Sequence, residues 1–292
     1  MSTIGIDIGG TKIKFGMFDG NGQLIREDQI KTPKGAIVEY MIEEIKKMVQ
    51  GEEIHGIGVA SAGIVDFQNG IIKSCPNLHA LANVPIQVML ENTFNVSVVV
   101  GNDANCAALA EGTAGAARAV SSYICITLGT GIGGGIVHNN ELVHGYNGYG
   151  GEVGHMTIVP NGIACECGRK GCWEAYASGK ALERVIASDS DLASKNYLPK
   201  DVFNQYTMDA TCKRIVDRYL EYLSIGLINL QYIFDPEMIV IGGGLIDSSE
   251  HWWDELEEKI DAAASIPVTL QQAFLKNNAS MIGASSLVKQ GK

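Results

Sequence analysis

The fold is decided first by the N-terminal stretch Thr3–Phe18, which reads TIGIDIGGTKIKFGMF. Apolar residues recur on both sides of its Gly9-Gly10-Thr11 segment, and this pattern predicts two β-strands joined by a tight turn. A second turn is expected at 19–22, which reads DGNG, because Asn and Gly tolerate positive φ. With a third strand expected near 24–30, the chain opens as a meander of three strands.

Strands then alternate with helices through the first part of the chain. An amphipathic helix is expected after Pro33, followed by a buried strand over 54–60. Two more helices are expected near 84–94 and 104–112, with a strand over 96–100 between them. Alternation of this kind is typical of an α/β fold.

The pattern restarts in the second part of the chain. A strand is expected over 123–128, then a glycine turn at Gly129–Gly135, then a strand from Ile136 that ends at the turn Asn139-Asn140. Because this unit occurs twice at a long interval, it indicates duplication of a fold and not a short solenoid repeat. The remaining elements are expected to be mostly helix over 179–234, strands over 237–241 and 268–270, and helices over 252–263 and 282–289.

Composition excludes several classes of protein. The chain has 292 residues, a net charge of −11 and a pI near 5.0, which argues against broad binding to nucleic acid. No apolar run approaches the roughly 18 residues that a membrane helix needs, and no signal peptide precedes the first strand. The seven cysteines are an odd number without regular spacing, so no disulfide framework is expected. We expect a cytoplasmic protein without nucleic-acid or membrane partners.

The two glycine turns are candidate phosphate-binding sites. Glycine lets the backbone approach an anion, and bare N–H groups in such a turn form an anion-binding nest. Neither turn is a Walker loop or a Rossmann fingerprint, since no helix follows either one. The alternative is that both are only tight hairpins. The carboxylate of Asp7 on the preceding strand, and Gly242–Gly244 after a third buried strand, favour a nucleotide site.

A second candidate site is the stretch Gly101–Asn105, between the end of a strand and the start of a helix. A carboxylate at the carboxyl end of a buried strand is where a general base would face a substrate. Phosphoryl transfer to an alcohol needs such a base to orient the hydroxyl and accept its proton. By its position, Asp103 is also expected to be the N-cap of the helix, and the alternative is that capping is its only role.

A third candidate is a metal site formed by His155, Cys165, Cys167 and Cys172. Three thiolates and one imidazole make the closed tetrahedral set that structural Zn²⁺ prefers, and nearby glycines supply the tight turns. With no open coordination position, the metal would stiffen the loop and would not act as a Lewis acid. The alternative is a cluster of buried or redox-active cysteines.

These motifs occur in order along essentially the whole chain, and the sequence resembles the sugar kinases of the ROK family (repressor, open reading frame, kinase). The resemblance rests on Asp7–Lys12, Gly101–Asn105, Gly151–His155 and Cys165–Glu174. It implies the fold of the actin-like ATPase superfamily, an α/β fold of two ribonuclease H-like lobes with a cleft between them.

The resemblance also implies the extent of the two lobes. The N-terminal lobe is expected to comprise residues 1–118, joined by the last helix, 280–292. The C-terminal lobe is expected to comprise residues 119–279, with the zinc loop at 155–172. We also expect a homodimer, because dimers are common in the family.

The activity that the resemblance implies is ATP-dependent phosphorylation of a hexose, usually on its C6 hydroxyl. Asp103 would be the base, Asp7 would lie near Mg²⁺, and His155 would ligate zinc through one ring nitrogen and contact the sugar through the other. The residues expected to bind the sugar are Ser61, Gly63, Asn77, Asn102, Asp103, Glu152, His155 and Glu174. Those expected to bind the nucleotide are Asp7, Gly9, Gly10, Thr11, Lys12, Gly129, Thr130, Gly131, Gly133, Gly134, Gly243 and Gly244.

The sugar itself stays open between several candidates. Residues 59–66 read VASAGIVD and lack the Pro-Gly of many glucokinases and fructokinases of this family, so they are more similar to N-acetylmannosamine kinases. Residues 75–80 read CPNLHA and lack the tryptophan that glucokinases often place just beyond. We favour an N-acylmannosamine or a glucose-type hexose, with β-glucoside kinase and fructokinase as alternatives.

Two other classes of protein are weighed against a kinase. Sugar-sensing repressors of the family carry a DNA-binding domain before the first glycine turn, and here Asp7 lies only seven residues from the start. A sugar-binding pseudoenzyme would be expected to lack Asp103 or a glycine turn. The apolar stretch 225–234 is expected to be core, whereas Trp252-Trp253 is expected to be exposed and is a candidate subunit contact.

Overall fold

The computed structural model describes residues 2–75 and 78–289, and the chain divides into two compact units. So far as they are described, the first unit comprises Met1–Arg118, Gly135–Gly151 and Asn277–Lys292, and the second comprises Ala119–Gly134 and Glu152–Lys276. None of the helices in the described ranges combines the length and the apolar character that crossing a membrane requires.

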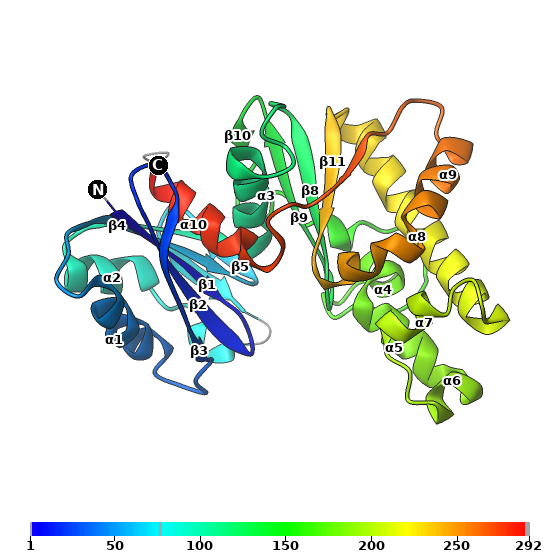
Figure 1. Cartoon of the computed structure of the whole chain (residues 1–292), viewed down its shortest axis with the longest axis horizontal. Helices are drawn as coiled ribbons and strands as arrows, with labels where there is room; N and C mark the ends of the chain where they lie inside the picture. Colours follow the sequence, from blue (N-terminus) through cyan, green and yellow to red (C-terminus); the bar gives the residue numbers. More distant parts are fainter. Residues whose placement is uncertain (1, 76–77, 290–292) are drawn as a thin grey trace. The chain divides into compact units, whose positions relative to one another are not determined.

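A five-stranded sheet in the order β3-β2-β1-β4-β7 forms the centre of the first unit (Figure 1). The first three strands make the expected antiparallel meander, and β4 and β7 run parallel to β1. The strand bounds are β1 Ser2–Ile8, β2 Lys12–Phe18, β3 Leu24–Lys31, β4 Ile54–Ser61 and β7 Ser97–Asn102.

The two faces of this sheet differ because side chains alternate along a strand. Ile4, Ile6 and Ile8 pack into the main apolar core with α1 (Ile37–Val49) and α2 (Ile86–Phe94). The opposite face of β1 carries Gly5 and Asp7, and the last helix packs on it. The short elements β5 Ile64–Asp66, β6 Ile71–Ser74 and the 3-10 turn η1 His79–Leu81 complete this part of the unit.

The last helix, α10 (Ala279–Lys289), packs closely against β1, β4 and α3 (Asp103–Ala114) through glycines (Figure 1). A Cβ built on Gly58 would lie 1.7 Å from the carbonyl oxygen of Ala284, and one built on Gly283 would lie 1.7 Å from that of Cys106. Side chains at these positions would separate the elements. The glycines of the first unit therefore serve this close approach as well as the turns.

A second five-stranded sheet has the order β10-β9-β8-β11-β12, which repeats the topology of the first. β9 and β10 are antiparallel, with Asn139 and Asn140 at positive φ in the turn between them, and β11 and β12 run parallel to β8. The repeated order confirms the expected α/β duplication. The strand bounds are β8 Tyr123–Leu128, β9 Ile132–His138, β10 Glu141–Leu142, β11 Met238–Gly242 and β12 Leu270–Gln272.

The helices of the second unit follow the Cys/His segment 155–172, and several of them pack against the long helix α8. Their bounds are α4 Glu174–Ala177, α5 Gly179–Ser188, α6 Ser190–Ser194, α7 Pro199–Asn204, α8 Ala210–Phe234 and α9 Trp253–Ala263. The 3-10 turns are η2 Val153–His155, η3 Gly244–His251 and η4 Lys276–Asn278, the last of which crosses into the first unit.

One element was missed from the sequence, and one expected boundary was wrong. The hairpin of β5 and β6 was not expected, because its strands are only three and four residues long. The second glycine turn is shorter than expected, since β9 begins at Ile132. Gly133 and Gly134 therefore lie in a strand, and the turn comprises only residues 129–131.

The expected burial of two apolar stretches was wrong in part, although Leu227 and Leu230 are buried as expected. Trp252 is fully buried against Phe203, with ring centroids 5.8 Å apart, so it is not an exposed contact residue. Ile233 and Phe234, expected in the core, are exposed at the end of α8. Helical periodicity identifies an apolar face but not which part of a long helix the neighbouring elements cover.

Candidate active site

The carboxyl ends of three parallel strands place the first group of predicted residues side by side. Ile8 of β1 pairs with Ser61 of β4, and Ser61 pairs with Asn102 of β7. Asp7 therefore lies one row before this edge, and Asp103 lies one residue beyond it. Ligands of α/β sheets bind at such carboxyl edges, so the ladder supports the predicted grouping.

The glycine turn after β1 is fixed to the sheet by backbone groups. The Gly9 N–H donates to the Lys12 carbonyl at 3.1 Å, and the Thr32 hydroxyl donates to the Gly9 carbonyl at 2.7 Å. Gly10, Thr11 and Lys12 are exposed beyond these bonds. A fixed turn with an exposed tip suits the approach of an anionic ligand.

Asn102, and not Asp103, is the N-cap of α3. Its side-chain oxygen accepts from the N–H of Ala104 at 2.9 Å and of Asn105 at 3.1 Å, and Asp103 is the first helical residue. The expectation that Asp103 caps the helix was therefore wrong. Because Asn102 provides the cap, the Asp103 carboxylate is not needed for that purpose, although it still accepts from the Ala104 N–H at 2.9 Å.

Asn102 also fixes the turn that follows β4. Its amide Nδ2 donates to the Gly63 carbonyl at 3.0 Å. Gly63 has a φ of +87°, and a Cβ there would lie 2.1 Å from the Ser74 carbonyl, so only glycine fits. Ser61 is fully buried at the end of β4. The third residue predicted for this region, Asn77, lies outside the described residues.

Asp7 and Asp103 form an electrostatically coupled carboxylate pair. The pKa of Asp7 is raised to about 6, chiefly by burial and also by the neighbouring Asp103 carboxylate, while Lys14 opposes both effects. Burial also raises the pKa of Asp103, against the lowering effect of the backbone N–H groups of Ala104 and of Asp103 itself. A carboxyl whose pKa is raised toward neutrality is a better proton acceptor in catalysis.

The second unit places its glycine turn against the start of a helix. The N–H groups of Gly179 and Lys180, at the start of α5, donate to the carbonyls of Gly129 at 2.8 Å and Thr130 at 3.3 Å. A Cβ on Gly129 would meet no atom within 4 Å, so one side of the turn is open. The first turn of α5 therefore holds the carbonyl side of residues 129–130.

Glu174 contacts this glycine turn as well. Its Oε2 accepts from the Ile132 N–H at 3.4 Å and would lie 2.6 Å from a Cβ on Gly131. Its Oε1 lies 3.4 Å from His155 Nδ1 and accepts from the Cys165 thiol at 3.1 Å. One carboxylate thus joins the turn and the Cys/His cluster.

The two glycines after β11 differ in their surroundings. A Cβ on Gly243, whose φ is +91°, would lie 2.4 Å from the Leu128 carbonyl, whereas one on Gly244 would meet no atom within 4 Å. Close packing against the end of β8 therefore explains why residue 243 is a glycine. Open space beside Gly244 leaves its backbone accessible to a ligand.

The predicted metal ligands come together in the second unit. The ligand atoms of His155, Cys165, Cys167 and Cys172 all lie within 4.8 Å of one another. His155 Nδ1 lies 3.7 Å from the Cys165 sulfur, and the sulfurs of Cys167 and Cys172 are 3.6 Å apart. Tetrahedral coordination at a Zn–S distance of about 2.3 Å puts ligand atoms about 3.8 Å apart. The donor set and its spacing therefore fit Zn²⁺.

The loop around this cluster is shaped by two glycines at positive φ. Gly168 has a φ of +86° just after Cys167, and Gly171 has one of +81° just before Cys172. On the other side of the cluster, His155 Nε2 lies 3.7 Å from Glu152 Oε2. Glu152, His155 and Glu174 are thus brought together, as predicted from the sequence.

Some neighbours of these residues were missed from the sequence. Lys14 lies opposite Asp7 in the β1–β2 ladder, and the Ser280 hydroxyl donates to the Asp103 carbonyl at 3.2 Å. Side chains alternate between the two faces of β2, and this alternation could have been used to predict that Lys14 lies on the same face of the sheet as Asp7. Nothing local links Ser280 to Asp103, because 177 positions separate them.

Comparison with known proteins decides the family. The ROK family model matches residues 3–291. The chain belongs to the ROK family. Its resemblance to the sugar kinases of that family, inferred from the motifs, is thereby confirmed.

Individual ROK relatives match over their whole length. A glucokinase from Streptomyces coelicolor is 34% identical, covering 99% of this chain and 98% of the relative. An N-acetylmannosamine kinase from Haemophilus influenzae is 33% identical, covering 99% and 96%. The crystal structure of a ROK glucokinase from Streptomyces griseus, in complex with glucose and AMPPNP, has a TM-score of 0.83 at 31% identity and covers all of both chains.

Proposed function

We propose that this protein is an ATP-dependent sugar kinase that transfers the γ-phosphate of ATP to the C6 hydroxyl of a hexose. The observation that carries the proposal is the position of Asp103 at the start of α3, with a pKa raised by burial, in a chain that the ROK family model matches over residues 3–291. The glucokinase and N-acetylmannosamine kinase relatives support the reaction class. The AMPPNP complex of the Streptomyces griseus enzyme supports ATP as donor.

In the proposed reaction Asp103 accepts the proton of the sugar hydroxyl. The hydroxyl oxygen then bonds to the γ-phosphorus as the bond to ADP breaks, giving a sugar phosphate and ADP. Sugar binding is assigned to Ser61, Gly63, Asn77, Asn102, Asp103, Glu152, His155 and Glu174. Nucleotide binding is assigned to the two glycine turns with Asp7 and Lys12, to Gly133 and Gly134, and to Gly243 and Gly244.

Two ions complete the proposal. Mg²⁺ accompanies ATP and neutralises charge on the transferred phosphate. Zn²⁺ would be held by His155, Cys165, Cys167 and Cys172, and a closed set of four ligands supplies structure to the loop rather than reactivity.

The proposed substrate is an N-acylmannosamine or a glucose-type hexose. Relatives of both kinds are about equally identical to this chain, at 33% and 34%, so identity does not separate them. β-Glucosides and fructose are the alternatives. A coupled ADP-release assay over these sugars tests the proposal, and assembly as a homodimer stays a prediction.

A further inference from the structure

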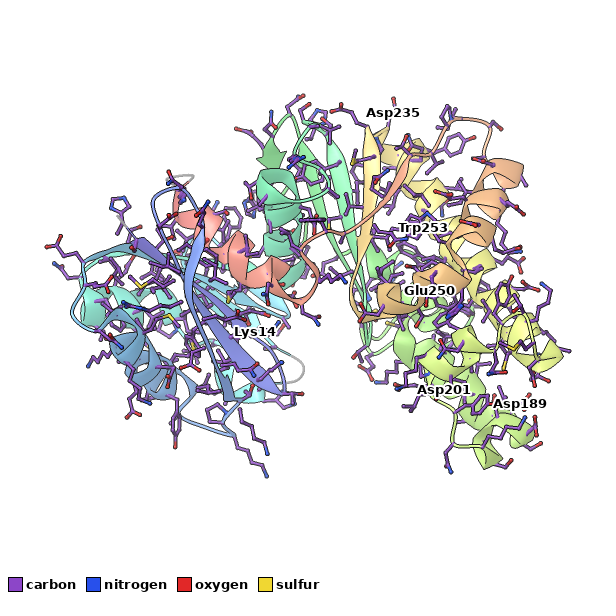
Figure 2. The ribbon with its side chains drawn as sticks, in the orientation of Figure 1. Lys14, Asp189, Asp201, Asp235, Glu250 and Trp253 are labelled. Atoms are coloured by element: carbon purple, nitrogen blue, oxygen red, sulfur yellow. The ribbon has the colours of Figure 1, made fainter. Side chains whose placement is uncertain are left out.

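Lys14 lies beside the carboxylate pair in a position that the proposed roles do not use. In the β1–β2 ladder Asp7 pairs with Lys14, so the two side chains share one face of the sheet. Lys14 is half-buried on this face (Figure 2, where it is labelled). Burial lowers its pKa, and the Asp7 carboxylate raises it again.

The ammonium group of Lys14 has a second partner. It donates to the carbonyl of Asn277, which is 263 positions away. Asn277 is the residue at which the chain re-enters the first unit, and α10 begins two residues later at Ala279. Lys14 therefore connects two parts of the first unit. One is the segment that leads into α10, and the other is the β1–β2 pair that carries Asp7.

The first turn of α10 then contacts the proposed base. The Ser280 hydroxyl donates to the Asp103 carbonyl at 3.2 Å. A Cβ on Gly5 would lie 2.2 Å from the Met281 carbonyl, so the same turn of α10 also lies directly on β1. Elements packed this closely move together, and displacing residues 277–280 displaces the backbone of Asp103.

We propose that Lys14 is a positioning residue, which lies opposite Asp7 and holds the segment Asn277–Ser280 so that Ser280 fixes the backbone of Asp103. The inference rests on the proposed function. Lys14 does not touch the sugar in this account, and it acts on turnover through the placement of Asp103.

The test compares Lys14→Met with Lys14→Arg, and uses Lys46→Met, an exposed lysine of α1 in the same unit, as the control. A misplacement of about 1 Å costs up to about 100-fold in rate, so we expect kcat of Lys14→Met to fall at least about tenfold. The sugar KM is expected to change much less than kcat, because the sugar contacts assigned to Glu152, His155 and Glu174 are not displaced. Lys14→Arg keeps the donor and the charge and is expected to restore most of kcat.

Hydrogen exchange gives a readout that does not need turnover. In Lys14→Met the backbone amides of residues 279–283 are expected to exchange faster, and in Lys46→Met they are expected to exchange as in the wild type. Wild-type kcat in Lys14→Met, or a loss of kcat that Lys14→Arg does not restore, overturns the inference. If the wild-type protein turns over no sugar, the proposed function fails. Hydrogen exchange alone then tests the positioning role of Lys14, and unchanged exchange of residues 279–283 in Lys14→Met overturns it.

Discussion

Two opposing effects act on the pKa of the Asp103 carboxyl. Burial disfavours its ionised form, while the backbone N–H groups at the start of α3 favour it. Their net effect raises the pKa of Asp103. The Asp103 carboxylate is not needed to cap α3, because Asn102 is the N-cap. This arrangement suits a proton acceptor that faces an alcohol.

Replacing Asp103 by Asn tests the proposed base. We expect Asp103→Asn to lower kcat by about 10²- to 10⁴-fold, the usual effect of losing a general base, with the sugar still bound. Steady-state kinetics and calorimetric titration of the sugar measure the two effects separately. Asn102→Ala serves as a comparison, since it removes the N-cap and the Gly63 contact but leaves the carboxylate. Turnover of Asp103→Asn close to the wild type would remove Asp103 from this role.

The pH dependence of activity follows from the same carboxyl. Because Asp103 must be ionised to accept a proton and burial raises its pKa, kcat/KM is expected to fall on acidification at a pH above the ordinary range of Asp. A profile that stays flat down to the pKa of a free carboxyl, about 4, would contradict this prediction.

Asp7 gives a prediction about stability. Its pKa is raised to about 6 in the folded protein, against about 3.9 in an unfolded chain, so the folded state holds the proton more tightly. The free energy of unfolding therefore falls as pH rises from about 4 to about 6. We expect Asp7→Asn to be more stable at pH 8 by up to about 3 kcal/mol, with this gain vanishing near pH 4. Urea unfolding at the two pH values measures it, and a destabilised variant at pH 8 would contradict the account.

At the scale of elements, the proposed zinc loop is expected to depend on its metal for stability. We expect the purified protein to hold about one equivalent of Zn²⁺, and Cys172→Ser to lose it together with thermal stability. Cys212→Ser is the matched control, since Cys212 is equally buried but lies outside the cluster. Metal analysis and thermal melts report both effects. Retention of full zinc by Cys172→Ser would contradict the assigned ligand set.

The contact between β4 and α10 gives a second prediction at this scale. A Cβ on Gly58 would lie 1.7 Å from the Ala284 carbonyl, so Gly58→Ala must displace the helix. We expect it to cost at least about 1–3 kcal/mol of stability, as overpacking does. Gly35→Ala is the control, because a Cβ there would meet no atom within 4 Å. Equal unfolding midpoints for the two variants would show that α10 does not pack as described.

What the sequence predicted at this scale depended on local pattern. The strand–turn–strand units and the zinc ligands within residues 155–172 were predicted because their spacing lies within one segment. The contact of Ser280 with Asp103 was not predicted, because Ser280 belongs to a helix and lies 177 positions from Asp103. Burial was mispredicted at Trp252 and Ile233, since neither residue type nor periodicity says which elements cover a given turn.

At the scale of the whole molecule, two sheets of the same strand order carry the predicted residues at their carboxyl edges. In the first, Ser61 and Asn102 are neighbours in the ladder. In the second, Gly242 of β11 pairs with Thr127 of β8, two residues before Gly129. Sequence motifs alone placed residues at strand ends, and the ladders explain why those ends lie together. The repeated fold thus places one group of the proposed site residues at the end of each sheet.

Sugar phosphorylation by this protein can be measured with a coupled ADP-release assay. ATP with Mg²⁺ would be offered with glucose, mannose, fructose, N-acetylmannosamine, N-acetylglucosamine and cellobiose. We predict turnover on one hexose or a narrow group, lost by at least about 100-fold in Asp103→Asn. Folded, zinc-bound protein that releases no ADP with any of these sugars would contradict the account.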